Sequence, residues 1–221
     1  MTISWPGSGN TFPDRLLYYS AALLPYLTVP AGLYLLKSAW SAILAYQLGM
    51  LLFLLVARRP PRQPEIVRRR APRRWTAALL AACLSSGLLV LLIWPWAGRL
   101  SPADLAVWLS RLGLAPKTWP VFIAYMCLTT PWLEEQYWRG WLGRLGRPAV
   151  ETSAWFAGYH LLVLMPILQP AWLALVFFSL TAAGWSWQRL SGFRNGLLWA
   201  VLSHSAADLS VMLAASWLLR T

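Results

Sequence analysis

Charged side chains are scarce in this chain. They make up 12% of its 221 residues, and only seven of them are acidic. Soluble domains carry about a quarter charged residues, so the deficit excludes an ordinary soluble domain and indicates lipid as the solvent. The chain has only two cysteines. Cys83 and Cys127 both lie inside apolar segments, so we expect neither a disulfide framework nor a paired zinc knuckle.

Long apolar segments are what the chain has instead. Apolar residues make up 58% of it, and 16 residues are tryptophan, which prefers the membrane–water boundary. A helix needs about 20 mostly apolar residues to cross a bilayer. The sequence therefore predicts an all-α protein, a polytopic transmembrane helix bundle of about seven spans. The predicted spans are residues 16–36, 39–56, 75–96, 119–138, 152–168, 171–187 and 196–219.

Residues 101–114 predict a different kind of helix. Ser101, Pro102 and Asp104 read as a capping box with proline at the first helical position. An apolar stripe follows at helical spacing, made of Leu105, Trp108, Leu109 and Leu112. This pattern is typical of a short amphipathic helix that lies in the membrane interface and does not cross the membrane.

The positive charge is concentrated in one place. Eight arginines fall between residues 58 and 74, directly between two predicted spans, and the chain carries a net charge of +12. Such a loop normally stays in the cytosol and contacts anionic lipid. No nucleic-acid-binding motif accompanies it, so we expect no nucleic-acid partner. Alternation of the spans then places Arg144, Arg147 and the 189–194 turn on the same side, as the positive-inside rule requires.

Five ionisable side chains lie inside the predicted spans. Each costs on the order of 3 kcal/mol to insert, so their presence needs a reason. They are Glu134, Glu135, His160, His204 and Asp208. At about 1.5 Å per helical residue, Glu134, His160 and His204 each lie roughly 13–15 Å from the cytosolic boundary. Three separate spans thus place ionisable groups in one layer.

Local spacing brings some of these groups together. Glu135 and Arg139 are four residues apart and can pair on one helical face, while Glu134 is rotated about 100° from Glu135 toward a cavity. Two adjacent carboxylates in low dielectric resist simultaneous ionisation, which favours one of them as a general base. Two further pairs share the four-residue spacing: Phe156 with His160, and His204 with Asp208. Any one pair alone could be structural, but together they favour a catalytic site.

These residues form three ordered motifs: EExxxR at 134–139, FxxxH at 156–160 and HxxxD at 204–208. The pattern resembles the CPBP family of membrane proteins, which comprises CAAX proteases and bacteriocin-processing proteins and includes the type II CAAX prenyl endopeptidases. The resemblance covers roughly residues 119–219. It implies catalytic core helices at 119–221, preceded by N-terminal transmembrane helices (1–100) and the interfacial helix (101–118).

The resemblance also implies roles for individual residues. Glu134 would be the general base, His160 would orient the attacking water, and His204 would stabilise the oxyanion with Asp208 beside it. The supporting residues would be Arg139, which holds Glu135, and Phe156, which walls the site. Many family members carry Asn where this chain has Asp208. Since an ionised Asp cannot donate to an oxyanion, we expect Asp208 to orient and charge His204.

The implied activity is that of a glutamic-type intramembrane endopeptidase. Its partner would be a membrane-anchored or lipidated protein or peptide substrate, and its location a bacterial inner membrane with the site nearer the cytosolic side. Two His and three carboxylates could also bind a divalent metal, but no HExxH is present. We therefore expect no metal and no cofactor. Two alternatives stay open: a non-proteolytic scaffold or bacteriocin-immunity protein of the same fold, and a proton-coupled transporter, against which the lack of an internal repeat argues.

Overall fold

The computed structural model of the chain describes residues 12–56 and 69–220, and throughout these residues the ordered segments are helical. This confirms the all-α prediction. The α-helices are α1 (Phe12–Pro30), α2 (Ala39–Val56), α3 (Arg73–Ala97), α4 (Pro102–Arg111), α5 (Trp119–Glu134), α6 (Ala149–Leu164), α7 (Pro170–Ser191) and α8 (Gly196–Leu218). Three shorter segments follow directly on other helices: the π-helical turns η1 (Ala31–Leu35) and η2 (Glu135–Trp141) and the 3-10 turn η3 (Leu142–Arg144).

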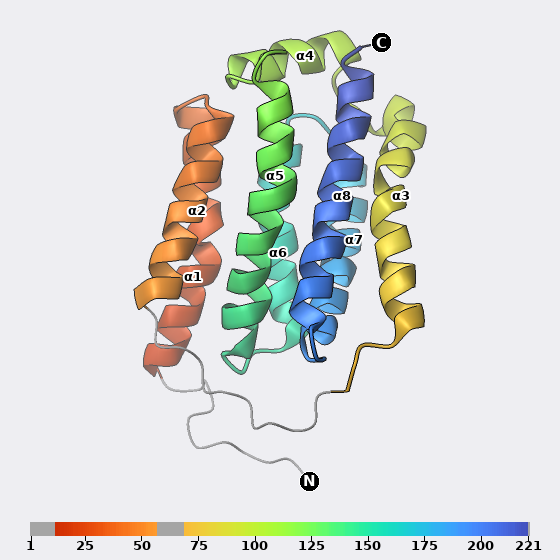
Figure 1. The fold of residues 1–221 in the computed structure, drawn as a ribbon. Coiled ribbons are helices and arrows are strands. Elements are labelled where there is room, and N and C mark those ends of the chain that lie inside the picture. The colour runs from red at the N-terminus through yellow and green to blue at the C-terminus, as the bar shows by residue number, and fades with distance from the viewer. Residues whose placement is uncertain (1–11, 57–68, 221) are drawn as a thin grey trace.

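Helices α1 to α3 and α5 to α8 run side by side as a bundle (Figure 1). Helices α1 and α2 pack together on one side, α6 packs on both α1 and α7, and α8 packs on both α5 and α7. The turn η2 contacts α2, α7 and α8, so the segment that follows α5 lies inside the bundle. Helix α3 is peripheral, because its main contact is with α8.

The contact between α3 and α8 is close because glycine allows it. A Cβ on Gly87 would lie 2.0 Å from the carbonyl oxygen of Ser210, which leaves no room for any side chain. The backbone N–H of Gly87 also donates to Oγ of Ser210 at 2.8 Å. Small residues are the usual means by which membrane helices approach closely, and here they attach α3 to the helix that carries His204.

Helix α4 lies across one end of the bundle, at a large angle to the long helices (Figure 1). Its first turn is capped as the sequence predicts, since Oγ of Ser101 accepts from the backbone N–H of Asp104 and proline occupies the first turn. The apolar stripe faces the bundle, where Leu105 and Leu112 are buried. The helix therefore covers the helix ends and does not run parallel to them.

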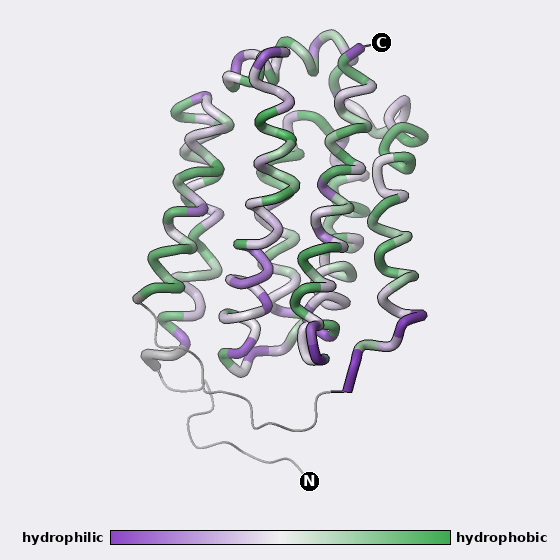
Figure 2. The backbone as a smooth tube through the Cα atoms, in the orientation of Figure 1, coloured by the Kyte–Doolittle hydropathy of each residue, from purple (hydrophilic) through white to green (hydrophobic). Residues whose placement is uncertain are grey.

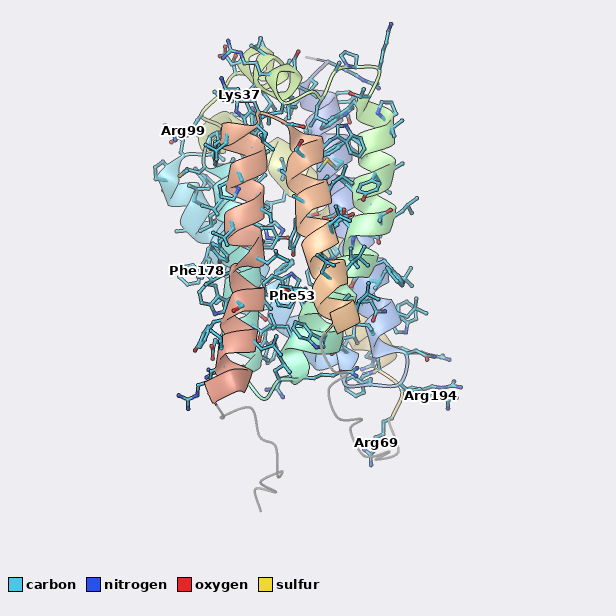
Figure 3. All side chains as sticks on the ribbon, turned by 90° about the vertical axis from the view of Figure 1, so that its left-hand side faces the viewer. Lys37, Phe53, Arg69, Arg99, Phe178 and Arg194 are labelled. Atoms are coloured by element: carbon cyan, nitrogen blue, oxygen red, sulfur yellow. The ribbon has the colours of Figure 1, made fainter. Side chains whose placement is uncertain are left out.

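Basic side chains lie at both ends of the bundle, but arginines are concentrated at one of them. Arg69 and Arg194 lie at the end opposite Lys37 and Arg99 (Figure 3), and the backbone N–H of Arg194 donates to the carbonyl of Arg69 at 3.2 Å. The α5–α6 and α7–α8 connections, which carry further arginines, lie at this same end (Figure 1). We refer to it as the arginine end. Much of the loop expected to contact lipid (58–74) lies outside the described residues.

Three described helices are long and apolar enough to cross a membrane: Arg15–Leu35, Arg73–Ala97 and Gly196–Leu218, with the shorter apolar helix Ala39–Leu55 beside them. The seven-span count stays a prediction. Helix α5 is not among these three, and Figure 2 shows that its segment turns hydrophilic toward the arginine end. The predicted 152–168 span is wrong at its end: α6 stops at Leu164, two residues before Pro166, which has no backbone N–H to continue the helical hydrogen bonds.

Candidate active site

Two adjacent carboxylates are buried where α5 ends and η2 begins. Glu134 is 2% exposed and Glu135 is fully buried. Pro131 lies inside the preceding turn and cannot donate a backbone hydrogen bond, and the chain then widens from α- to π-helix at Glu135. Such single π-turns inside helices often occur at functional sites.

Glu135 is held by two cationic or polar partners. Its Oε1 accepts from Nη1 of Arg139 at 2.9 Å, so the pair expected from the EExxxR spacing forms. The same oxygen lies 2.9 Å from Nδ1 of His204, which comes from α8. Since a carboxylate accepts hydrogen bonds, the ring proton of His204 must lie on Nδ1. Glu135 therefore neutralises the charge of Arg139 and orients the ring of His204.

The other ring nitrogen of His204 faces two more carboxylates. Its Nε2 lies 3.6 Å from Oε2 of Glu134 and 3.7 Å from Oδ1 of Asp208. Both distances are within ion-pair range and longer than a hydrogen bond. Asp208 is partly exposed, with 23% of its side chain accessible, whereas Glu134 is buried. The imidazole that binds Glu135 through Nδ1 thus presents Nε2 to both Glu134 and Asp208.

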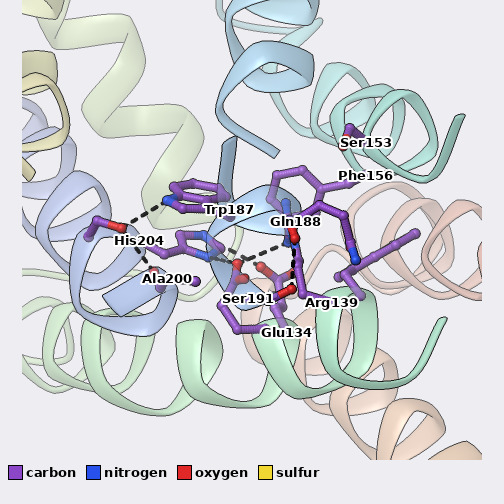
Figure 4. Close-up of polar contacts among 12 residues, drawn as sticks. Glu134, Arg139, Ser153, Phe156, Trp187, Gln188, Ser191, Ala200 and His204 are labelled. Carbon is purple, nitrogen blue, oxygen red and sulfur yellow. Dashed lines mark hydrogen bonds and ion pairs between the residues drawn. The ribbon is translucent and has the colours of Figure 1, made fainter. Parts of the chain in front are cut away.

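Trp187 of α7 fixes the plane of the imidazole. Its ring stacks on that of His204 with centroids 4.5 Å apart and 15° between the planes. Its Nε1–H donates to Oγ of Ser203 at 2.9 Å, and Ser203 precedes His204 on α8. Figure 4 shows the indole lying along the His204 ring. The hydrogen bond to Ser203 holds the indole in place, and the stacked indole in turn restrains the His204 ring.

Phe156 occupies the centre of the cluster. The guanidinium carbon of Arg139 lies 4.2 Å from its ring centroid, a cation–π contact, and the rings of His160 and His204 lie 4.7 and 5.8 Å away. Space for the guanidinium comes from Gly184 of α7, where a Cβ would lie 2.9 Å from Nη2 of Arg139. Phe156 therefore separates His160 from the Glu135–Arg139 pair.

His160 is near the other groups but makes no direct hydrogen bond to Glu134 or His204 in the described part of the chain. Its Nδ1 donates to the carbonyl of Phe156 at 2.8 Å, one turn earlier on α6. A carbonyl only accepts, so Nδ1 carries the proton and Nε2 is left as an acceptor when the ring is neutral. The side chain is half-buried, and its ring packs on Tyr159 with centroids 4.1 Å apart.

Two tyrosines reach Glu134 that the motifs did not predict. Tyr159 of α6 donates its hydroxyl hydrogen to Oε1 of Glu134, and the hydroxyl of Tyr46 of α2 lies beside the same carboxylate. Tyr159 directly precedes His160, so its position in the sequence was a usable signal. Tyr46 and Trp187 lie outside the three motifs, and no spacing rule connects them to the site. The N-terminal transmembrane part of the chain, which carries none of the three motifs, thus contributes Tyr46.

No set of three or more His, Cys, Asp or Glu side chains within residues 12–56 and 69–220 is grouped so as to hold a metal ion. The acidic groups instead surround one imidazole. The arrangement offers a carboxylate that can accept a proton, an imidazole nitrogen beside it that can donate one, and a set of aromatic rings that exclude lipid. These are the parts that general acid–base hydrolysis requires.

Residues 116–210 match the protein-family model described as type II CAAX prenyl endopeptidase Rce1-like. The matched segment includes every residue of the three motifs, from Glu134 to Asp208. No curated protein and no solved structure matches the chain. The family is one of integral membrane proteases that act on membrane-anchored proteins, in agreement with the apolar helices of the fold.

Proposed function

We propose that this chain, whose residues 116–210 match the Rce1-like type II CAAX prenyl endopeptidase family, hydrolyses a peptide bond of a membrane-anchored or lipidated protein. The attacking water would be activated by Glu134. The observation that carries the proposal is the buried approach of Glu134 Oε2 to His204 Nε2 at 3.6 Å. Glu134 lies at the end of α5 and His204 lies in α8, with α6 and α7 between them in the chain, so only the fold brings the two together.

The proposed reaction uses Oε2 of Glu134 and Nε2 of His204, because the other polar atom of each side chain already has a hydrogen-bond partner. Glu134 Oε2 takes a proton from water while the water oxygen attacks the scissile carbonyl carbon, and the carbonyl oxygen becomes an oxyanion. His204 donates to that oxyanion from Nε2, which requires the doubly protonated ring. The carboxylates of Glu134, Glu135 and Asp208 around the ring stabilise its positive charge. Glu134 then gives its proton to the leaving nitrogen as the carbon–nitrogen bond breaks.

His160 has the geometry of a water-orienting group. Its Nδ1–H is committed to the carbonyl of Phe156. Nε2 can therefore accept a hydrogen bond from the attacking water and direct one of its lone pairs at the substrate carbonyl. Asp208, which faces His204 Nε2 at 3.7 Å, adds negative charge beside the imidazole and does not itself donate.

The site lies toward the arginine end, where α5 ends (Figure 2). By the positive-inside rule this end faces the cytosol, so the scissile bond would be presented from the cytosolic half of the bilayer. The proposed setting is a bacterial inner membrane. Arginines of the 58–74 loop would bind anionic lipid headgroups.

The test is a single substitution followed through two assays. Glu134→Ala should abolish hydrolysis by the purified, reconstituted protein, and its elution and detergent stability should stay close to those of the unaltered chain. The substrate is found by comparing the termini of membrane proteins in cells that make either form. Full complementation of a deletion by Glu134→Ala would reject the proposal and favour a non-proteolytic scaffold or immunity protein.

We further propose a metal-free, glutamic-type reaction. The protein is dialysed against a chelator, and elemental analysis verifies that it is free of metal. Its rate of hydrolysis should then be unchanged. A rate that falls on chelation and returns with Zn²⁺ would instead assign the carboxylates and histidines to a metal.

A further inference from the structure

Glu134 is held by residues to which the mechanism above gives no role. Its Oε1 accepts from the hydroxyl of Tyr159, and the hydroxyl of Tyr46 reaches the same carboxylate. The two tyrosines come from α6 and α2, and their rings contact each other with centroids 5.4 Å apart. Both side chains are buried, at 5% and 1% exposure. A buried polar hydroxyl is costly unless it is bonded, so these contacts are part of the site's construction.

The hydrogens of this cluster can be assigned from the donors. Trp138 in η2 donates its Nε1–H to the Tyr46 oxygen at 2.8 Å. An indole N–H only donates, so Tyr46 must accept there and keeps its own hydrogen for the carboxylate side. Trp138 also stacks on Tyr159, with 10° between the rings and 6.3 Å between centroids. Each phenol is therefore oriented by a tryptophan that lies one turn after Glu134 on the same chain segment.

From this geometry we propose that Tyr159 and Tyr46 act as positioning residues for the proposed hydrolysis, a clamp that holds Glu134 by Oε1 so that Oε2 alone faces His204. Because the Tyr159 hydroxyl hydrogen is directed at Oε1, a proton taken from water goes to Oε2, the oxygen 3.6 Å from Nε2 of His204. The proton acceptor and the donor to the oxyanion are thereby kept on the same side of the carboxylate.

The clamp also explains how the Glu134 carboxylate keeps one orientation although the adjacent Glu135 binds other partners. Glu135 is held by Arg139 and His204, whereas Glu134 has no cation of its own at hydrogen-bond distance in the described part of the chain. Without the phenols, rotation about the terminal bond of Glu134 would exchange its two oxygens. The inference rests on the proposed function, since it assigns the base oxygen of that reaction.

The experiment compares three tyrosine-to-phenylalanine variants. Tyr159→Phe and Tyr46→Phe remove only the hydroxyls, and each should lower kcat roughly 10- to 100-fold because the base loses its orientation. KM should stay within about twofold, because neither hydroxyl is proposed to touch the substrate. Tyr125→Phe is the matched control, since its hydroxyl bonds Gln47 on α2 and not Glu134. It should leave kcat unchanged.

A second measurement keeps the clamp testable without catalysis. In detergent, Tyr159→Phe should lower the Tm of the unaltered protein by more than it lowers the Tm of Glu134→Ala, where the partner carboxylate is absent. Equal shifts in both backgrounds overturn the clamp. Hydrolysis that depends on Glu134 but survives Tyr159→Phe and Tyr46→Phe also overturns it, and leaves the proposed function standing. If the unaltered protein hydrolyses nothing, the proposed function fails, and the Tm comparison alone decides whether the clamp exists.

Discussion

Oε1 of Glu135 lies 2.9 Å from Nδ1 of His204, although the two residues are 69 positions apart in the chain. The same oxygen binds Arg139, so a single atom connects the EExxxR motif to the HxxxD motif. The adjacent Glu134 is the better placed of the two acids for proton transfer, because Glu135 is already committed. The neighbouring glutamates therefore have separate tasks, and substitution should separate them.

Glu135→Gln should unfold more easily than Glu134→Gln. The first change leaves the buried Arg139 without its counter-ion, and an uncompensated buried charge costs about 3–5 kcal/mol. The second change leaves the Glu135–Arg139 pair intact. Thermal unfolding of both variants in the same detergent measures the difference, and both should lose most hydrolysis. A Tm for Glu134→Gln below that of Glu135→Gln would contradict this division.

Asp208→Asn should retain most hydrolysis. Asp208 lies 3.7 Å from Nε2 of His204, too far for a hydrogen bond, and Glu135 already orients the ring through Nδ1. An amide at this position keeps the shape and can donate to an oxyanion. We expect a change in kcat of less than about 10-fold, with Asp208→Ala as the comparison that removes the group. Complete loss in Asp208→Asn would show that the negative charge is required.

Trp187→Leu should reduce kcat and leave the fold intact. The substitution removes the ring that stacks on His204 and the N–H that binds Ser203. The stacked pair contributes about 0.5–1.5 kcal/mol beyond its buried area. The cavity left by a fully buried indole adds about 1–3 kcal/mol, so Tm should fall although the bundle still forms. Misorientation of His204 should lower kcat roughly 10-fold or more. Ser203→Ala, which frees the indole but keeps the stack, should have the smaller effect, and the reverse order would argue against orientation by stacking.

Gly87→Ala should destabilise the protein from outside the site. The new Cβ would lie 2.0 Å from the Ser210 carbonyl oxygen, so α3 must move away from α8. Overpacking of this kind costs about 1–3 kcal/mol. Ser85→Ala, an exposed position on the same helix, is the control and should change stability by less than about 0.5 kcal/mol. Equal Tm values for the two variants would show that the close approach is not needed.

The sequence was most informative where local spacing decides the outcome. Arg139 meets Glu135 because residues four apart share a helical face, and α4 begins at Ser101 because its cap is local. The ionisable residues within apolar spans come from segments that the structure brings together around Phe156 and His204. The helix ends were less predictable: Pro166 ended α6 four residues before the apolar run suggested.

The remaining parts of the site depend on contacts between distant segments. Tyr46 reaches Glu134 from a helix 88 positions earlier, and an isolated tyrosine in an apolar span carries no sign of such a partner. Trp187 is one of 16 tryptophans, most of which composition assigns to the membrane boundary. The π-turn after Glu134 also follows no simple periodicity. Tertiary packing brings these residues to the site, and no local sequence pattern predicts it.

The pairing of Glu135 with Arg139 has a consequence for how the protein is made. Both charges belong to one short stretch of chain, so they neutralise each other as soon as that stretch coils, before α8 has been synthesised. The segment can then enter the bilayer without waiting for His204, at a lower cost than two separate ions would impose. Assembly of the bundle brings the imidazole to an acid that is already in place, so the site is completed only when α8 is inserted.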